Sequence, residues 1–253
     1  MTKVLVHGNP ETDAIWGPLV AALAEREVDE IVTVSPPGFG VPSHPDWNPT
    51  PAAYVDWLHG EIIEFDGDVD LLGHDWGAGH VLGVAAAYPE SIRSWGVDVA
   101  GLVHPDYRWH DAAAGWQTPE VGEQMIDAMV SMPVAERIAA YQGLGLPTDV
   151  AVSMAEALGA DMGRCILGLY RAAVQPFMAQ LGDRLAAAQS RPSLIIDATA
   201  DEYVSTDLVA AVADRNSSTV HTLADHGHWW MLSAPDLAAD GLTAFWKGLE
   251  TPG

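Results

Sequence analysis

Leu71-Leu72-Gly73-His74-Asp75-Trp76-Gly77-Ala78-Gly79 reads as an apolar strand that runs into a Gly-x-Asp-x-Gly turn, with a helix after it. This layout is typical of a sharp strand-to-helix turn whose central residue has a strained backbone conformation. Small residues two positions before and after the centre relieve the crowding, and Gly73 and Gly77 occupy those positions. A carboxylate held there can attack carbon and form an ester with the protein. The alternative interpretation is a glycine-rich turn with an incidental exposed Asp75.

Apolar strands and amphipathic helices alternate on both sides of this turn. We expect strands at 3–6, 31–34, 69–72, 95–99, 194–198 and 219–223, and helices at about 15–23, 51–64, 78–88 and 235–249. Thr50 is a suitable cap for the helix that begins at Pro51. The alternation predicts a parallel sheet that is covered by helices on both faces.

The rhythm changes after about residue 101. Residues 102 to about 190 show no convincing strand, and their pattern predicts helices at about 119–130, 133–142, 148–158 and 161–180. A helical insertion between two strands of the sheet is the simplest account of this stretch.

The composition narrows the range of partners and compartments. The net charge of −24 over 253 residues argues against nucleic acid and anionic membranes as partners, and makes a strongly anionic substrate a poor fit. Cys165 is the single cysteine, so no internal disulfide can form, which suits the cytoplasm. We find no signal-peptide pattern and no apolar run of the roughly 18 residues that a spanning helix needs.

Three further positions follow predicted strands, as Asp75 does. His7-Gly8-Asn9 follows the first strand, Asp201 follows the strand at 194–198, and His228 follows the strand at 219–223. Functional groups of parallel sheets gather at the carboxyl ends of the strands, so we expect these residues to lie close together. No His/Cys/Asp/Glu cluster has metal-ligand spacing, so no metal is expected.

The order of nucleophile, acid and histidine is that of the α/β-hydrolase triad. With His7-Gly8-Asn9-Pro10, Gly73-His74-Asp75-Trp76-Gly77 and Gly227-His228, the chain resembles the aspartate-nucleophile branch of the α/β-hydrolase superfamily, the epoxide hydrolases and haloalkane dehalogenases. The resemblance implies an α/β-hydrolase fold with a mostly parallel sheet of about six strands, in which the family's N-terminal strand pair is missing. It implies a core domain of residues 1–101 and 191–253, a helical cap of residues 102–190 inserted after the sixth-strand position, and no cofactor.

The resemblance also assigns roles in catalysis. Asp75 would attack an alkyl carbon, His228 would activate the water that hydrolyses the resulting ester, and Asp201 would orient His228. The backbone N–H groups of Asn9 and Trp76 would form the oxyanion hole. Asp98, in the predicted strand at 95–99, is the alternative candidate for the acid that orients His228. His226 is the rival histidine, although the spacing to Pro235 favours His228, and the other histidines, His110 among them, read as surface or core residues.

The leaving group separates two activities. An epoxide oxygen needs a proton donor, for which the resemblance indicates Tyr170 on the cap with Tyr141 as its partner, or Tyr107 in place of Tyr141. A halide needs N–H donors, for which Asn9 and Trp76 are the candidates. We favour hydrolysis of a small, apolar, uncharged epoxide, with haloalkane dehalogenation as the alternative. A serine-independent esterase or lactonase, or a binding protein without activity, fits the sequence less well.

Overall fold

A parallel sheet of six strands lies at the centre of the computed structural model, which describes residues 1–250. The strand order is β2-β1-β3-β4-β5-β6, and every neighbouring pair is parallel. The strands are β1 (Thr2–Val6), β2 (Ile31–Val34), β3 (Val69–Gly73), β4 (Ser94–Val97), β5 (Ser193–Ala198) and β6 (Thr219–Leu223). The predicted fold class is therefore confirmed, and the carboxyl ends of all six strands lie along the same edge of the sheet.

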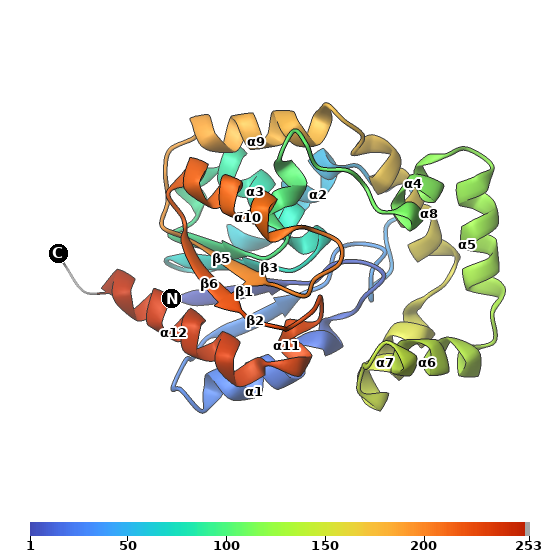
Figure 1. Ribbon diagram of the computed structural model, residues 1–253, viewed down its shortest axis with the longest axis horizontal. Coiled ribbons are helices and arrows are strands. Elements are labelled where there is room, and N and C mark those ends of the chain that lie inside the picture. Colours follow the sequence, from blue (N-terminus) through green and yellow to red (C-terminus); the bar gives the residue numbers. More distant parts are fainter. Residues whose placement is uncertain (251–253) are drawn as a thin grey trace.

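Helices cover both faces of the sheet (Figure 1). One layer contains α2 (Pro51–Ile62), α3 (Trp76–Ala87), α9 (Phe177–Ala187) and α10 (Thr206–Asn216), and the other contains α1 (Gly17–Ala24), α11 (Trp230–Ser233) and α12 (Pro235–Glu250). Alternate strand residues point to the two layers. Val4 and Leu71 pack in the core beneath α3, whereas Leu5 and Leu72 pack in the core beneath α1.

The stretch between β4 and β5 is helical, as the sequence predicts. It forms the short helix η3 (Ala100–Val103), then α4 (Asp111–Gln117), α5 (Val121–Ser131), α6 (Val134–Gly143), α7 (Thr148–Ala157), α8 (Ala160–Ala172) and α9. Figure 1 shows α5, α6 and α7 lying beyond one end of the sheet, whereas α9 packs against α3. The domain boundaries at residues 102 and 190 stay a prediction.

One predicted helix in this stretch was wrong. The sequence pattern predicts a single helix at about 161–180, but α8 ends at Ala172 and α9 begins only at Phe177. Pro176 lies in the gap, where it cannot donate a helical hydrogen bond and disfavours helical backbone in the residue before it. The helices α4 and α10 were not predicted.

Local capping explains where α2 begins. The Thr50 hydroxyl accepts a 3.2 Å hydrogen bond from the Ala53 N–H, and Pro51 occupies the first turn of α2, as expected from the sequence.

No helix within residues 1–250 is both long enough and apolar enough to cross a membrane.

The start of α3 packs directly on the end of β1. A Cβ atom added to Gly77 would lie 2.1 Å from the Val6 carbonyl oxygen, and one added to Gly73 would lie 2.4 Å from the Gly77 carbonyl oxygen. Neither neighbour is a flexible side chain, so neither can move aside cheaply. The two glycines on either side of Asp75 are therefore required by close backbone contact.

This contact predicts a large effect of one methyl group. Gly77→Ala should lower the free energy of unfolding by about 3 kcal/mol, because the new methyl group forces backbone apart. Gly60→Ala is the matched control, since Gly60 is also helical but has nothing within 4 Å of its added Cβ. The control should stabilise the protein by about 1 kcal/mol, as Ala generally does relative to Gly in a helix. Urea denaturation measures both, and equal midpoints for the two variants would contradict the contact.

Candidate active site

Asp75 lies at the turn between β3 and α3 with a strained backbone. Its φ is 51° and its ψ is −121°, a backbone conformation that residues other than glycine rarely adopt. Gly8 lies directly against its carboxylate, since a Cβ atom added to Gly8 would lie 2.2 Å from Asp75 Oδ1. The turn therefore holds the Asp75 side chain above the ends of the strands.

The two carboxylate oxygens of Asp75 have different surroundings. The backbone N–H of Asn9 donates a 2.9 Å hydrogen bond to Oδ1, whereas Oδ2 lies 3.9 Å from His228 Nε2. Burial raises the pKa of Asp75, and the charge of His228 lowers it, so that the pKa lies at about 6. The carboxylate is thus ionised at neutral pH, with one oxygen bound and the other facing the histidine.

His228 is held by an acid, and that acid is Asp201. The His228 Nδ1 lies 2.9 Å from Asp201 Oδ2, and the backbone N–H of Tyr203 donates a 2.8 Å hydrogen bond to Asp201 Oδ1. Burial raises the pKa of Asp201, but its bond to His228 lowers it further, so the net shift is downward. The structure therefore brings Asp75, His228 and Asp201 together in the order that the sequence predicts.

Asp98, the rival acid, belongs to a different network beneath the site. Its Oδ1 accepts a 3.1 Å hydrogen bond from the Asp75 N–H, and its Oδ2 is bonded to His74 and, at 2.7 Å, to the Trp230 indole N–H. None of the hydrogen bonds within residues 1–250 joins Asp98 to His228. His226, the rival histidine, lies 3.2 Å from the Ser233 hydroxyl instead.

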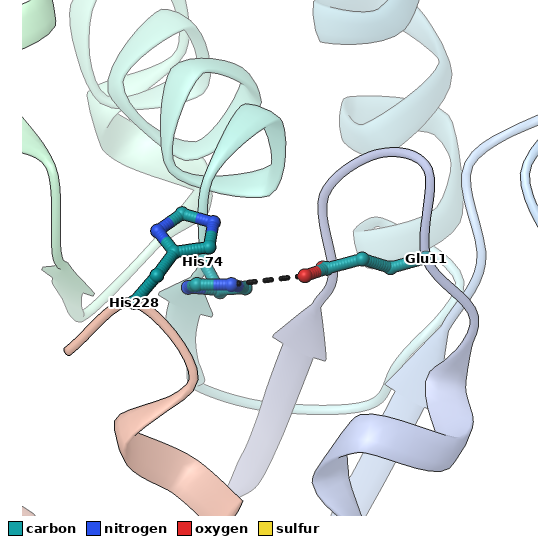
Figure 2. A group of neighbouring side chains, drawn as sticks. All are labelled: Glu11, His74 and His228. Carbon is teal, nitrogen blue, oxygen red and sulfur yellow. Dashed lines mark hydrogen bonds and ion pairs between the residues drawn. The ribbon is translucent and has the colours of Figure 1, made fainter. Parts of the chain in front are cut away.

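His74 sits between two buried carboxylates. Its Nδ1 contacts Asp98, and its Nε2 lies 3.2 Å from Glu11 Oε1 (Figure 2). Burial lowers the pKa of His74, but Asp98 and Glu11 raise it well above its ordinary value. Both ring nitrogens are therefore protonated and donate, and His74 is a buried imidazolium.

Glu11 links this cation to the loops of the site. It accepts hydrogen bonds from the Gly8 N–H at 3.0 Å and from the Trp229 indole N–H at 2.6 Å. Burial raises the pKa of Glu11, but the charge of His74 and the bond to it bring the pKa down to about 2. Figure 2 shows the His228 ring lying against the His74 ring, and the ring centroids are 4.5 Å apart.

These residues form a group whose geometry could also suit a metal ion. One ligand atom each from Glu11, His74 and His228 lies within 4.8 Å of the others, which the sequence spacing did not reveal. Both ring nitrogens of His74 are already hydrogen-bonded to carboxylates, and the Nδ1 of His228 is bonded to Asp201. The hydrogen bonds account for the arrangement of these side chains.

A small pocket opens beside Asp75. Its volume is about 20 Å³, and it is lined by Trp76, Tyr107, Trp109, His110, Tyr170 and Tyr203, among others. That volume holds little more than one water molecule. Tyr107 and Tyr170 are both buried, and burial and the charge of Asp75 raise both pKa values, so the hydroxyls stay protonated.

The structure places Tyr141 elsewhere. Tyr141 packs at the edge of the core that contains α1 and α12, and it does not line the pocket beside Asp75. Tyr107, the alternative partner of Tyr170, does line it. The structure therefore does not bring Tyr170 and Tyr141 into one pocket, because Tyr141 packs with the core that contains α1 and α12.

Asn9 and Trp76 present N–H groups close to Tyr170. The Tyr170 hydroxyl donates a long 3.5 Å hydrogen bond to Asn9 Oδ1, and its ring packs edge-on to Trp76. Within residues 1–250, neither the side-chain N–H₂ of Asn9 nor the indole N–H of Trp76 has a hydrogen-bond acceptor. Buried donors without acceptors are costly, and an anion or oxygen bound beside Asp75 would satisfy them.

Four residues of this site were missed from sequence. Glu11 and His74 lie next to recognised motifs, but nothing in their spacing shows that they contact one another. Tyr203 follows Asp201 by two residues, which is the only signal it carried. His110, expected at the surface or in the core, instead lines the pocket with its ring against Tyr203 at 4.9 Å.

The comparisons with known proteins agree with this architecture. A model of the alpha/beta hydrolase family matches residues 4–240. The chain belongs to this family. The predicted membership of the superfamily is confirmed, and the α/β-hydrolase is accordingly an enzyme of the hydrolase class. The comparison with curated proteins gives no match.

Solved structures of the same fold carry different activities. A haloalkane dehalogenase from Bradyrhizobium elkani is 21% identical, with a TM-score of 0.74, over 98% of this chain and 90% of that chain. E-2-(Acetamidomethylene)succinate hydrolase is 19% identical, with a TM-score of 0.72, over 97% of this chain and 91% of that chain. At these identities the likeness shows the fold, and the reaction must be argued from the site.

The buried network predicts a loss of stability when one carboxylate is neutralised. Glu11→Gln should lower the free energy of unfolding by about 3 kcal/mol, because it removes one of the two charges that stabilise buried His74. Glu61→Gln, at an exposed position of α2, is the control and should change it by less than about 0.5 kcal/mol. Urea denaturation at neutral pH measures both variants. A Glu11→Gln midpoint equal to that of the control would show that His74 carries no buried charge.

Proposed function

We propose that this α/β-hydrolase converts a small, apolar epoxide to a diol through a covalent ester on Asp75. The observation that carries the proposal is the buried, protonated hydroxyl of Tyr170 in the same pocket as Asp75, with Tyr107 beside it. A hydroxyl at that place can give a proton to an epoxide oxygen while the carboxylate attacks the ring carbon.

Asp75 acts as the nucleophile in the first half-reaction. Its Oδ2 attacks the carbon, because Oδ1 is held by the Asn9 N–H. The ring C–O bond breaks, and the oxygen takes a proton from Tyr170 or Tyr107. The nearby charge and the burial that raise the pKa of both tyrosines keep these protons in place until the leaving oxygen becomes basic.

His228 acts as the base in the second half-reaction. It takes a proton from water, whose oxygen attacks the carbonyl carbon of the Asp75 ester. Asp201, bonded to His228 Nδ1, orients the ring and stabilises the imidazolium. The Asn9 N–H, already bound to Oδ1, and the Trp76 backbone N–H would stabilise the oxyanion, and one such donor is typically worth about 10²-fold in rate.

Haloalkane dehalogenation is the second candidate, and one observation favours it. The Asn9 side-chain N–H₂ and the Trp76 indole N–H lack acceptors within residues 1–250, and a halide leaving Asp75 would accept from both. Trp76 lines the pocket but Asn9 does not, and Tyr170 lies against Asn9. The tyrosines are thus better placed than the Asn9 amide to meet a leaving group, which supports the epoxide.

Removing the Tyr170 hydroxyl separates the two activities. Tyr170→Phe should lower kcat/KM for epoxides by about 10²-fold, because the proton donor is lost, and should leave halide release from bromoalkanes within about threefold. Tyr141→Phe is the matched control, because Tyr141 lies outside the pocket. A small panel of epoxides and bromoalkanes, with diol and halide both followed, measures these values. Halide release without diol formation in the wild type would favour the dehalogenase.

Blocking the second half-reaction should trap the ester. His228→Gln should accumulate a covalent adduct on Asp75, because no base then activates water. Mass spectrometry of the intact protein identifies the chemistry. An epoxide adds its whole mass, whereas a bromoalkane adds its mass less that of HBr. Asp75→Asn is the control and should form no adduct. An active substrate that leaves no adduct on His228→Gln would contradict the two-step scheme.

A further inference from the structure

Two cavities meet at Tyr203. The first is the pocket of about 20 Å³ that Asp75 lines, and the second is a larger, more open cavity of about 370 Å³ that His228 lines. Tyr203 lines both, whereas Asp75 lines only the first and His228 only the second. The proposed nucleophile and the proposed base therefore line different cavities, although Asp75 Oδ2 lies only 3.9 Å from His228 Nε2.

Tyr203 lies between these spaces and contacts residues on both sides. Its backbone N–H is bonded to Asp201, and its ring packs edge-on against His228 and His110, with centroids 4.6 Å and 4.9 Å away. The ring thus contacts both the histidine of the site and a residue of the helical insertion. The residue is 39% exposed, so one side of it meets solvent.

The second cavity has both apolar and polar residues in its lining. Its walls come from the turn between α6 and α7, residues 144–147, and from the loop that carries His228 and Trp229. Glu202 and Ser233 add polar groups to the lining. Gly145 has a φ of 91°, which allows the sharp turn in this wall of the cavity.

We propose that this second cavity supplies the water that hydrolyses the Asp75 ester, with Tyr203 as the partition that keeps it apart from the substrate pocket. The inference rests on the two-step reaction proposed above. During the second step the alkyl group fills the small pocket, which leaves no room there for water to reach His228. A separate route on the other side of Tyr203 lets water arrive without departure of the alkyl group.

The step balances without any further reactant. Water from the second cavity gives one proton to His228 Nε2 as its oxygen bonds to the carbonyl carbon of the ester. The bond between that carbon and the alkyl oxygen then breaks. His228 returns the proton to the alkyl oxygen, so the product leaves as an alcohol and Asp75 is left as a carboxylic acid that carries the second proton of the water. That proton passes to the tyrosinate formed in the first half-reaction, which restores the Asp75 carboxylate and the hydroxyl of Tyr170 or Tyr107.

A bulky side chain in the second cavity tests the route. Leu144→Trp should slow hydrolysis of the ester by about tenfold and leave its formation unchanged within about twofold, since Leu144 lines only the second cavity. Leu237→Trp is the matched control, because Leu237 is similarly exposed on α12 and lines neither cavity. Quenched-flow single turnovers with mass detection of the adduct give both rate constants, and Ser233→Trp repeats the test from the other wall.

The possible results are distinct. Slow hydrolysis with normal ester formation, in Leu144→Trp and Ser233→Trp but not in Leu237→Trp, supports the proposal. Unchanged hydrolysis in both variants overturns it. An equal fall in ester formation and hydrolysis also overturns it, because the cavity would then admit substrate. If no adduct forms even on His228→Gln, the proposed function itself fails, and that result is seen before any cavity variant is made.

Discussion

The buried imidazolium of His74 holds the active-site edge of the sheet together. Its two ring nitrogens contact Glu11 and Asp98, which come from the loop after β1 and the end of β4. Each carboxylate also binds a backbone N–H of the site, Glu11 that of Gly8 and Asp98 that of Asp75. A cation between two anions, all taken out of water, is stable only when every partner is in place. The attraction of His74 for both carboxylates therefore fixes three segments relative to one another: the loop after β1, the turn after β3 and the end of β4.

The pocket beside Asp75 combines residues from two parts of the chain. Asp75 and the Asn9 N–H come from the carboxyl end of the sheet, whereas Tyr170 and His110 come from the helical insertion and close a pocket of about 20 Å³. A space of that size holds little more than one water molecule. The division suits a reaction in which a strained turn holds the nucleophile precisely while separate elements supply the donors for the leaving group.

The two proposed half-reactions involve the two cavities on either side of Tyr203. Ester formation takes place where Asp75 and the tyrosines meet, and ester hydrolysis needs water at His228. Tyr203 separates the two spaces, and its backbone N–H also binds the acid that orients His228. One short loop after β5 thus supplies the acid through Asp201 and the partition through Tyr203. A change in this loop would alter both the base and its access to water.

The sequence by itself determined the fold class, the order of the strands along the chain and the turn at Asp75, because these follow from local periodicity and from glycines at fixed offsets. It also indicated Asp201 and His228, since carboxyl ends of parallel strands must share an edge. Only the tertiary structure decided that His228 contacts Asp201 rather than Asp98, and that Tyr107 rather than Tyr141 lies beside Tyr170. It alone revealed the ion pair between Glu11 and His74, which are 63 residues apart. Such contacts depend on how segments that are distant in the sequence pack together, and the spacing of residues along the chain does not predict that packing.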